Sequence, residues 1–83
     1  MTRHKKLLDR ILRRTSDAHI AFDDLVNLLT HLGFAMRVRG SHHVLSKTGV
    51  TERINLQRDG TTAKPYQVRQ VRSVIVKFHL AGE

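Results

Sequence analysis

The sequence predicts an α+β domain: a three-stranded antiparallel sheet with helices on one face, plus an extra N-terminal helix. Three observations support this fold class. Apolar residues recur at helical spacing near both ends of the chain, they alternate with polar residues in the middle, and short turn signals separate the alternating segments. Connections this short favour antiparallel pairing of the strands. Because 83 residues build only one small core, we expect a single domain over residues 1–83.

The first predicted helix, residues 3–14, is short, basic and amphipathic. Its leucines and isoleucine fall at helical spacing among lysines and arginines, and Thr15-Ser16-Asp17 ends it with residues that favour turns. Residues 1–16 are thus predicted to form a basic helical extension in front of a core at residues 21–78. The basic face could contact phosphates, or it could be solvated while the apolar face packs on the domain. We favour packing, because runs of charge usually face solvent.

Two further helices carry the apolar stripes expected of core elements. One runs from about Phe22 to Leu32, begins with two acidic residues and precedes Gly33, a residue suited to a left-handed cap. The other begins at Pro65, which fits the first turn of a helix. Its apolar residues lie three and four positions apart, and charged residues keep its remaining surface polar. The apolar residues are Val68, Val71, Ile75 and Phe78, and the charged ones are Lys64, Arg69, Arg72 and Lys77.

Three strands are predicted between these two helices. Residues 34–39 and 52–57 alternate apolar and polar side chains, and residues 42–46 lie between two turn signals. Gly40-Ser41 forms a tight turn, and residues 47–50 form a loop. Since the helices cover one face of the sheet, the other face stays open to solvent. The open face should display Arg37, Arg39, one of two neighbouring histidines, Arg53 and Asn55.

The charge of the chain indicates a polyanionic partner. Fifteen Lys and Arg residues stand against seven Asp and Glu, a formal net charge of +8, and ten of the fifteen are arginines, which suit bidentate phosphate contacts. Nucleic acid is the first candidate, although a small protein can be basic without binding one. The chain has no cysteine, which excludes disulfides and Cys-containing zinc sites and fits a cytoplasmic location. No apolar run is long enough to cross a membrane.

Two adjacent histidines, His42 and His43, are the candidate catalytic groups. Imidazole gains and loses protons near neutral pH, and RNA carries its own nucleophile, the 2′-hydroxyl beside each phosphate. A protein that cleaves RNA this way needs a base, an acid and cations, and no metal. Adjacent strand residues point to opposite faces, so His42 faces the open side if Leu45 faces the core, and we favour His42. The alternative is a surface histidine without a catalytic role. Neither a metal site nor a triad built on Ser41 is indicated.

Several short motifs follow one another in an order that resembles the HicA family of toxins. Residues 28–34 have the sequence Leu-Leu-Thr-His-Leu-Gly-Phe, and residues 39–43 have the sequence Arg-Gly-Ser-His-His. The run Arg-Ile-Asn-Leu-Gln at residues 53–57 and the helix that begins Lys-Pro-Tyr-Gln at residues 64–67 fit the same pattern. The resemblance covers about residues 21–78.

The resemblance implies a fold similar to the double-stranded-RNA-binding domain, cleavage of mRNA independent of the ribosome, and inhibition by a cognate HicB-type antitoxin. It places the catalytic histidine directly after Gly-Ser, at His42, with Gly40 and Ser41 as the supporting turn. Because a chain of 83 residues has no room for a separate cofactor-binding domain, we expect no cofactor. Two features depart from the family pattern. The N-terminal helix precedes the usual family start. The histidine that many relatives carry after the proline of the last helix is missing, so its role is either absent here or filled by another group such as Tyr66.

The leading hypothesis is therefore a metal-independent mRNA endonuclease, the toxin of a toxin–antitoxin pair, with His42 as general acid or base. Its phosphate contacts are predicted at Arg37, Arg39, Lys47, Arg53 and Lys64. The alternative is a non-catalytic RNA-binding module of the double-stranded-RNA-binding type, in which the helix bearing Arg69 and Arg72 matters more than His42. A purely structural partner of an acidic protein ranks last, because it gives His42 no role.

Overall fold

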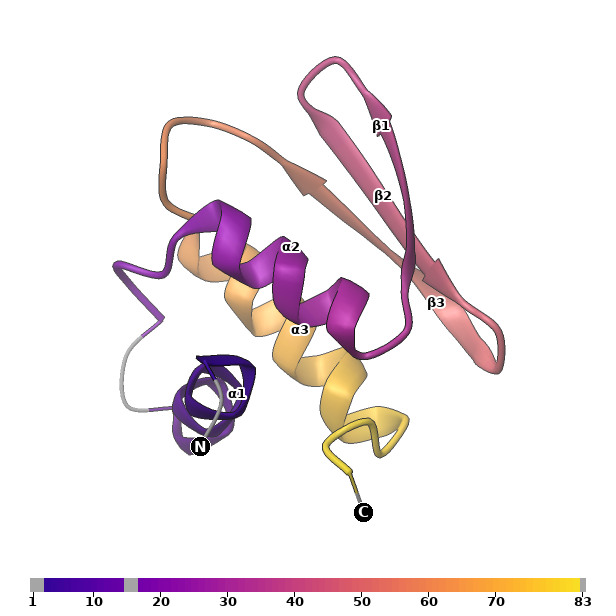
Figure 1. The fold of residues 1–83 in the computed structure, drawn as a ribbon. Coiled ribbons are helices and arrows are strands. Elements are labelled where there is room, and N and C mark those ends of the chain that lie inside the picture. Colours follow the sequence, from indigo (N-terminus) through magenta and orange to yellow (C-terminus); the bar gives the residue numbers. More distant parts are fainter. Residues whose placement is uncertain (1–2, 15–16, 83) are drawn as a thin grey trace.

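The computed structural model describes residues 3–14 and 17–82, and in these ranges it shows three helices and one three-stranded antiparallel sheet (Figure 1). The predicted fold class is confirmed. Of the predicted N-terminal extension, residues 1, 2, 15 and 16 lie outside the described residues, and so does most of the turn predicted at Thr15-Ser16-Asp17. The helices are α1 (Arg3–Arg13), α2 (Phe22–His31) and α3 (Pro65–Lys77), and the strands are β1 (Ala35–Arg39), β2 (His42–Lys47) and β3 (Val50–Gln57).

The chain turns from α2 into β1 through a glycine cap. Gly33 has φ +104°, in the left-handed region where glycine is favoured. Its N–H donates to the carbonyl of Thr30 at 3.1 Å, and the N–H of Phe34 donates to the carbonyl of Leu29 at 3.0 Å, the paired bonds of a Schellman motif. Phe34, predicted as the first strand residue, instead precedes β1 and is buried. The cap therefore ends the helix and anchors the start of the sheet in the core.

The sheet is a meander in the order β1-β2-β3, and both of its turns are tight. Arg39 pairs with His42 across the Gly40-Ser41 turn, as predicted. The predicted loop at residues 47–50 is shorter than expected, because Lys47 and Val50 pair with each other and only two residues turn the chain. An irregularity in the pairing between Leu45 and Lys47 accommodates this tight connection. β3 consequently begins at Val50 rather than near residue 52.

The core lies between β2, β3 and the α2–α3 pair. Leu45, Ile54 and Leu56, on the inner face of β2 and β3, are fully buried. The inner-face residues of β1 are not: Met36 is 44% exposed and Val38 is 50% exposed. Figure 1 shows α2 and α3 side by side on one face of the sheet. The helices therefore cover β2 and β3 around these three residues and leave β1 projecting into solvent.

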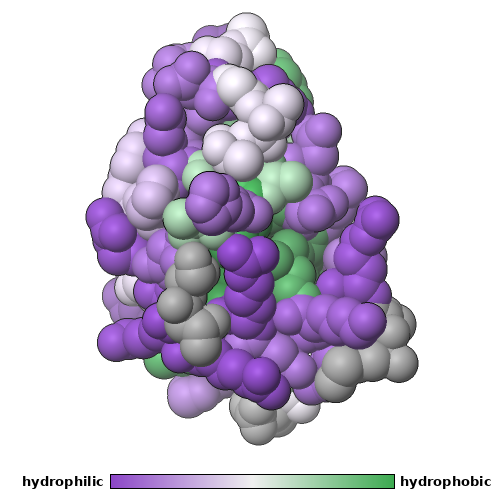
Figure 2. Space-filling view, turned by 90° about the vertical axis from the view of Figure 1, so that its left-hand side faces the viewer, coloured by the Kyte–Doolittle hydropathy of each residue, from purple (hydrophilic) through white to green (hydrophobic). Residues whose placement is uncertain are grey.

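Helix α1 packs on the α2–α3 pair, on the side away from the sheet (Figure 1). Leu8 and Ile11 are buried there, in agreement with the favoured interpretation of this helix as a packed element. Hydrophilic residues cover most of the face shown in Figure 2, around a smaller hydrophobic area near its centre. None of the described helices is long and apolar enough to span a bilayer.

One prediction for α3 is wrong. Arg72 was expected on the charged outer surface, but it is 7% exposed and lies under α1. Its Nε–H donates to the carbonyl of Ile11 at 2.8 Å, and its guanidinium forms an ion pair with Asp17. A buried guanidinium is tolerated only when it is paired and hydrogen-bonded, and both conditions are met here. Arg72 thus links α3 to α1 and to the segment that follows α1.

Candidate functional site

The open face of the sheet aligns its side chains in rows across the three strands. We call the row nearest the Gly40-Ser41 turn the turn row. The strand register places Arg39, His42 and Gln57 side by side in the turn row, and Arg37, Val44 and Asn55 side by side in the row behind it. The arginines, His42 and Asn55 are exposed, as expected from the alternation of the strands.

His42 stands in solvent at the centre of the turn row. A two-residue hairpin closes with a hydrogen-bonded pair, so the Cα atoms of Arg39 and His42 lie about 5.5 Å apart. Bonding then alternates along β2, which makes His42 and Gln57 a non-hydrogen-bonded pair about 4.5 Å apart, the closer arrangement for side chains. Arg37 is the diagonal neighbour of His42, at roughly 7–8 Å. The imidazole therefore has guanidinium groups on one side and an amide on the other.

The turn that presents His42 is held from inside the domain. Gly40 has φ +57°, whereas the φ of Ser41 is not positive. This is the pattern of a type II′ turn with glycine at its first central position. The carbonyl of Ser41 accepts two hydrogen bonds, from the backbone N–H of Arg58 at 2.8 Å and from Nδ1–H of His43 at 3.2 Å. Since one donor is the buried His43 of β2 and the other directly follows β3, the turn has little freedom to carry His42 away from Arg39.

His43 occupies the opposite face and a different environment. It is 8% exposed, and its ring meets the ring of Phe22 edge to face at 5.0 Å between centroids. The guanidinium of Arg58 lies over the same Phe22 ring at 4.6 Å and forms an ion pair with Asp23 at the start of α2. His43 and Arg58 thus fasten the turn to α2. The orientation predicted for the two histidines agrees with the structure.

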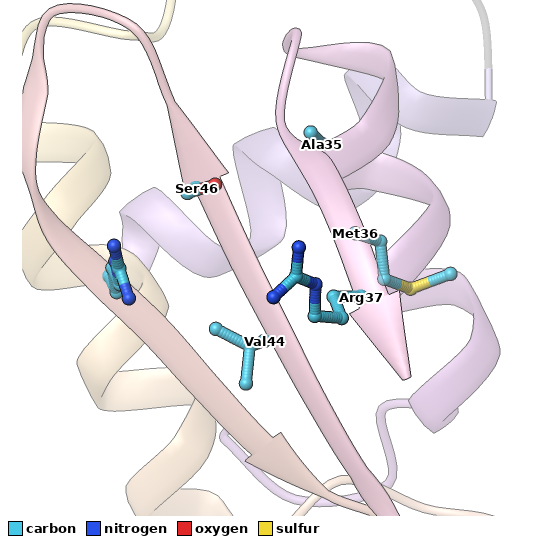
Figure 3. Close-up of a pocket in the computed structure, with 6 residues that line it drawn as sticks. Ala35, Met36, Arg37, Val44 and Ser46 are labelled. Atoms are coloured by element: carbon cyan, nitrogen blue, oxygen red, sulfur yellow. The ribbon is translucent and has the colours of Figure 1, made fainter. Parts of the chain in front are cut away.

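Behind the turn row the open face contains a shallow hollow of about 290 Å³ (Figure 3). Figure 3 shows Arg37 reaching from β1 across β2 toward Val44, whereas Met36 points away. Arg53 lines the same hollow from β3, and its floor is uncharged. Within residues 3–14 and 17–82, Arg37, Arg39 and Arg53 form no ion pair with an acidic side chain. Three guanidinium groups on this face are therefore available to an anion.

The structure does not bring the two predicted lysines to this group. Lys47 is five residues from His42 along β2, about 16 Å away at 3.3 Å per residue. Its ammonium lies over Gly33, where an added β-carbon would come within 2.5 Å of Nζ. Lys64 precedes α3 and forms an ion pair with Asp59 at 3.1 Å. Of the five predicted phosphate contacts, the structure groups Arg37, Arg39 and Arg53 on one face with His42.

Two glutamines at this end of the sheet escaped the sequence analysis. Gln57, directly opposite His42, continues the alternation of Arg53 and Asn55, so the pattern contained the signal. Gln67 gave no signal, because a polar residue in the first turn of a helix usually faces solvent. It is 1% exposed, accepts a bond from the Lys64 N–H at 3.0 Å and donates to the Gln57 carbonyl at 3.0 Å. It thereby fixes the end of β3, and with it the turn row, against α3.

No group of three or more His, Cys, Asp or Glu side chains that could hold a metal ion occurs in the described ranges. Comparisons of the chain with protein-family models, with curated proteins and with solved structures found no match. The geometry of the open face and the motif around His42 therefore carry the functional interpretation.

Proposed function

We propose that this protein is an mRNA endonuclease, the toxin of a HicA-type toxin–antitoxin pair that acts in the cytoplasm. One observation carries the proposal: an exposed imidazole, His42, stands on an anchored turn beside the guanidinium groups of Arg37 and Arg39, which form no ion pair with the described acidic side chains. A proton-transfer group next to fixed positive charge is what cleavage of a phosphodiester by its own 2′-hydroxyl requires. The resemblance of residues 39–43 to the HicA pattern points to the same histidine.

In the proposed reaction the 2′-oxygen of RNA attacks the adjacent phosphorus, and the bond from phosphorus to the 5′-oxygen of the next nucleotide breaks. His42 removes the proton of the 2′-hydroxyl or supplies the proton to the departing 5′-oxygen, and water serves as the other partner. The products are a 2′,3′-cyclic phosphate and a free 5′-hydroxyl. Arg37 and Arg39 stabilise the negative charge that accumulates on the phosphate oxygens. The amide of Gln57 can donate a hydrogen bond to the ribose or to the phosphate.

The alternative of a non-catalytic RNA-binding module loses one of its supports in the structure. It relied on Arg69 and Arg72 of α3, and Arg72 is buried and paired with Asp17. The open sheet face remains a basic surface in this alternative too. A binder of that kind would hold RNA in a strongly salt-dependent manner and release it intact.

A matched pair of histidine variants tests the proposed function. His42→Asn and His79→Asn both replace an exposed imidazole by an amide that cannot transfer protons at neutral pH, and His79 lies just after α3. We expect His42→Asn to lower the rate of RNA cleavage at least about 100-fold, the usual contribution of a general acid or base, while His79→Asn keeps the wild-type rate. Circular dichroism and thermal unfolding verify that both variants are folded. Full activity of His42→Asn, or a wild-type protein that binds RNA without cutting it, contradicts the proposal.

A further inference from the structure

Within residues 3–14 and 17–82, no element lies along the outer edge of the sheet at β1. All five residues from Ala35 to Arg39 are exposed, and among the described strands β1 pairs with β2 alone. Met36 and Val38 are about half exposed, because none of the described helices extends over β1. These two apolar side chains, on an edge strand, form a small hydrophobic patch beside a row of free backbone groups.

The free backbone groups belong to the same two residues. Because Arg39 and His42 form the hydrogen-bonded pair that closes the hairpin, the N–H and C=O groups of Arg39 and Arg37 point toward β2. Those of Met36 and Val38 then point outward, away from the sheet. No backbone hydrogen bond outside the helices and the strand ladder engages Met36 or Val38 in the part of the chain that the structure describes. The edge offers two donors and two acceptors at strand spacing.

β1 has two charged side chains, Arg37 and Arg39, but lacks the other features that usually prevent strand addition. Protected edges carry proline, lysine, an inward-pointing charge or a bulge. The sequence of β1, Ala-Met-Arg-Val-Arg, has only apolar residues on its inner face, and the pairing irregularity of this sheet lies between β2 and β3. Its two charges, Arg37 and Arg39, both lie on the open face. The edge is therefore open to a strand that tolerates guanidinium groups on one side.

We propose that β1 is the docking site for a β-strand of an acidic protein, which extends the sheet by one strand. On each face of the sheet, the side chains of an added strand would lie beside those of β1. On the open face the partner would place acidic residues beside Arg37 and Arg39, and on the inner face it would place apolar residues beside Met36 and Val38. A second copy of this chain is a poor occupant, because antiparallel pairing of two β1 strands sets arginine near arginine in a chain of net charge +8.

If the protein is the toxin proposed above, this strand belongs to the antitoxin, and that assignment rests on the proposed function. Acidic side chains beside Arg37 and Arg39 would withdraw these two guanidinium groups from the phosphates of RNA. They would also occupy the flank of the turn row next to His42. One added strand would thus hold the partner and remove the positive charge that cleavage requires.

A synthetic strand tests the docking site directly. The probe is an eight-residue peptide in which Glu and Val alternate. It is compared with a peptide of the same composition in which the Glu and Val residues are not alternated, and with the alternating peptide N-methylated at every second residue. Backbone amide spectra of the full chain report binding. We expect the alternating peptide to shift the amide signals of Met36 and Val38 and to slow their hydrogen exchange, and the other two peptides to do neither. Equal effects of the three peptides would show only attraction between opposite charges and would overturn the proposal.

Two valines of similar exposure provide matched variants. Val38→Lys places a charge on the inner face of β1, whereas Val76→Lys places one on α3, where Val76 is 56% exposed. We expect Val38→Lys to weaken binding of the alternating peptide by about tenfold or more, a change of about 1.4 kcal/mol, and Val76→Lys to leave it unchanged. Met36→Lys provides a second test if Val38→Lys does not fold. Unchanged binding in the folded β1 variants, or a concentration-dependent dimer that occupies this edge, rejects an acidic strand as the occupant.

Cleavage of RNA, measured on the same variants, separates this inference from the proposed function. Val38 and Met36 lie on the face away from His42, so Val38→Lys and Met36→Lys are expected to cut RNA at the wild-type rate. If the protein binds the peptide at β1 but cuts no RNA, the docking site stands and the proposed nuclease function is rejected. If the protein cuts RNA but the β1 amides do not respond to the peptide, the nuclease function stands and the docking site is rejected.

Discussion

The two edge strands of the sheet, β1 and β3, differ in how far the rest of the chain covers them. Along β3 the chain supplies its own cover: Gln67 of α3 donates to the outward carbonyl of Gln57, and Lys77 of α3 forms an ion pair with Glu52. Along β1 no such contact exists among the described residues, and Met36 and Val38 remain about half exposed. Two helices are wide enough to cover two strands, so the third must be covered by something else or stay in water. Because the helices do not reach β1, a partly apolar edge lies next to the row that holds His42.

The largest difference between the two edges should appear on core truncation. Leu56 of β3 is fully buried, so Leu56→Ala removes a packed side chain and leaves a cavity, at an expected cost of about 2–5 kcal/mol. Val38→Ala, on the same inner face of β1, is expected to cost less than about 1 kcal/mol because half of that side chain is already in water. Urea unfolding of the two variants measures both values. Equal losses would mean that β1 is packed as tightly as β3.

A smaller effect is expected from the amide that closes the β3 edge. Gln67→Ala removes the partners of the Lys64 N–H and the Gln57 carbonyl, at an expected cost of about 1–3 kcal/mol for two part-buried hydrogen bonds. Gln67→Glu, which keeps an acceptor for Lys64 but loses the donor to Gln57, separates the two bonds. Hydrogen exchange should accelerate at the end of β3 in both variants. An unchanged exchange rate there would mean that Gln67 does not hold the turn row in position.

The smallest effect is expected from the ion pair at the other end of β3. The side chains of Lys77 and Glu52 are 61% and 41% exposed, so water screens the pair and Lys77→Ala should change the free energy of unfolding by no more than about 0.5 kcal/mol. The difference should disappear in high salt, because ions screen exposed pairs. Thermal unfolding at low and high salt measures it. A larger, salt-resistant loss would indicate that α3 covers the β3 edge mainly through Lys77 rather than through packing and Gln67.

Local pattern alone was enough to predict the element order, the open face and the orientation of His42. Helical spacing and strict alternation are properties of the backbone, so they survive whatever packs around them. Gly33 and Gly40 marked the cap and the tight turn for the same reason, since each takes a positive φ that most residues avoid. The alternation also contained Gln57 as the neighbour of His42, one step beyond the residues singled out.

Tertiary structure decided which residues with equivalent patterns are buried or exposed. Nothing local distinguishes Val38, exposed on β1, from Leu56, buried on β3, because the difference is how far α2 and α3 extend across the sheet. Arg72 and Gln67 looked like surface residues, but both are buried. Asp17, 55 residues before Arg72, and Gln57, ten residues before Gln67, pair with their polar atoms. Burial and pairing depend on partners brought together only by folding. The periodicity of a single segment therefore specifies its faces but not what each face will contact.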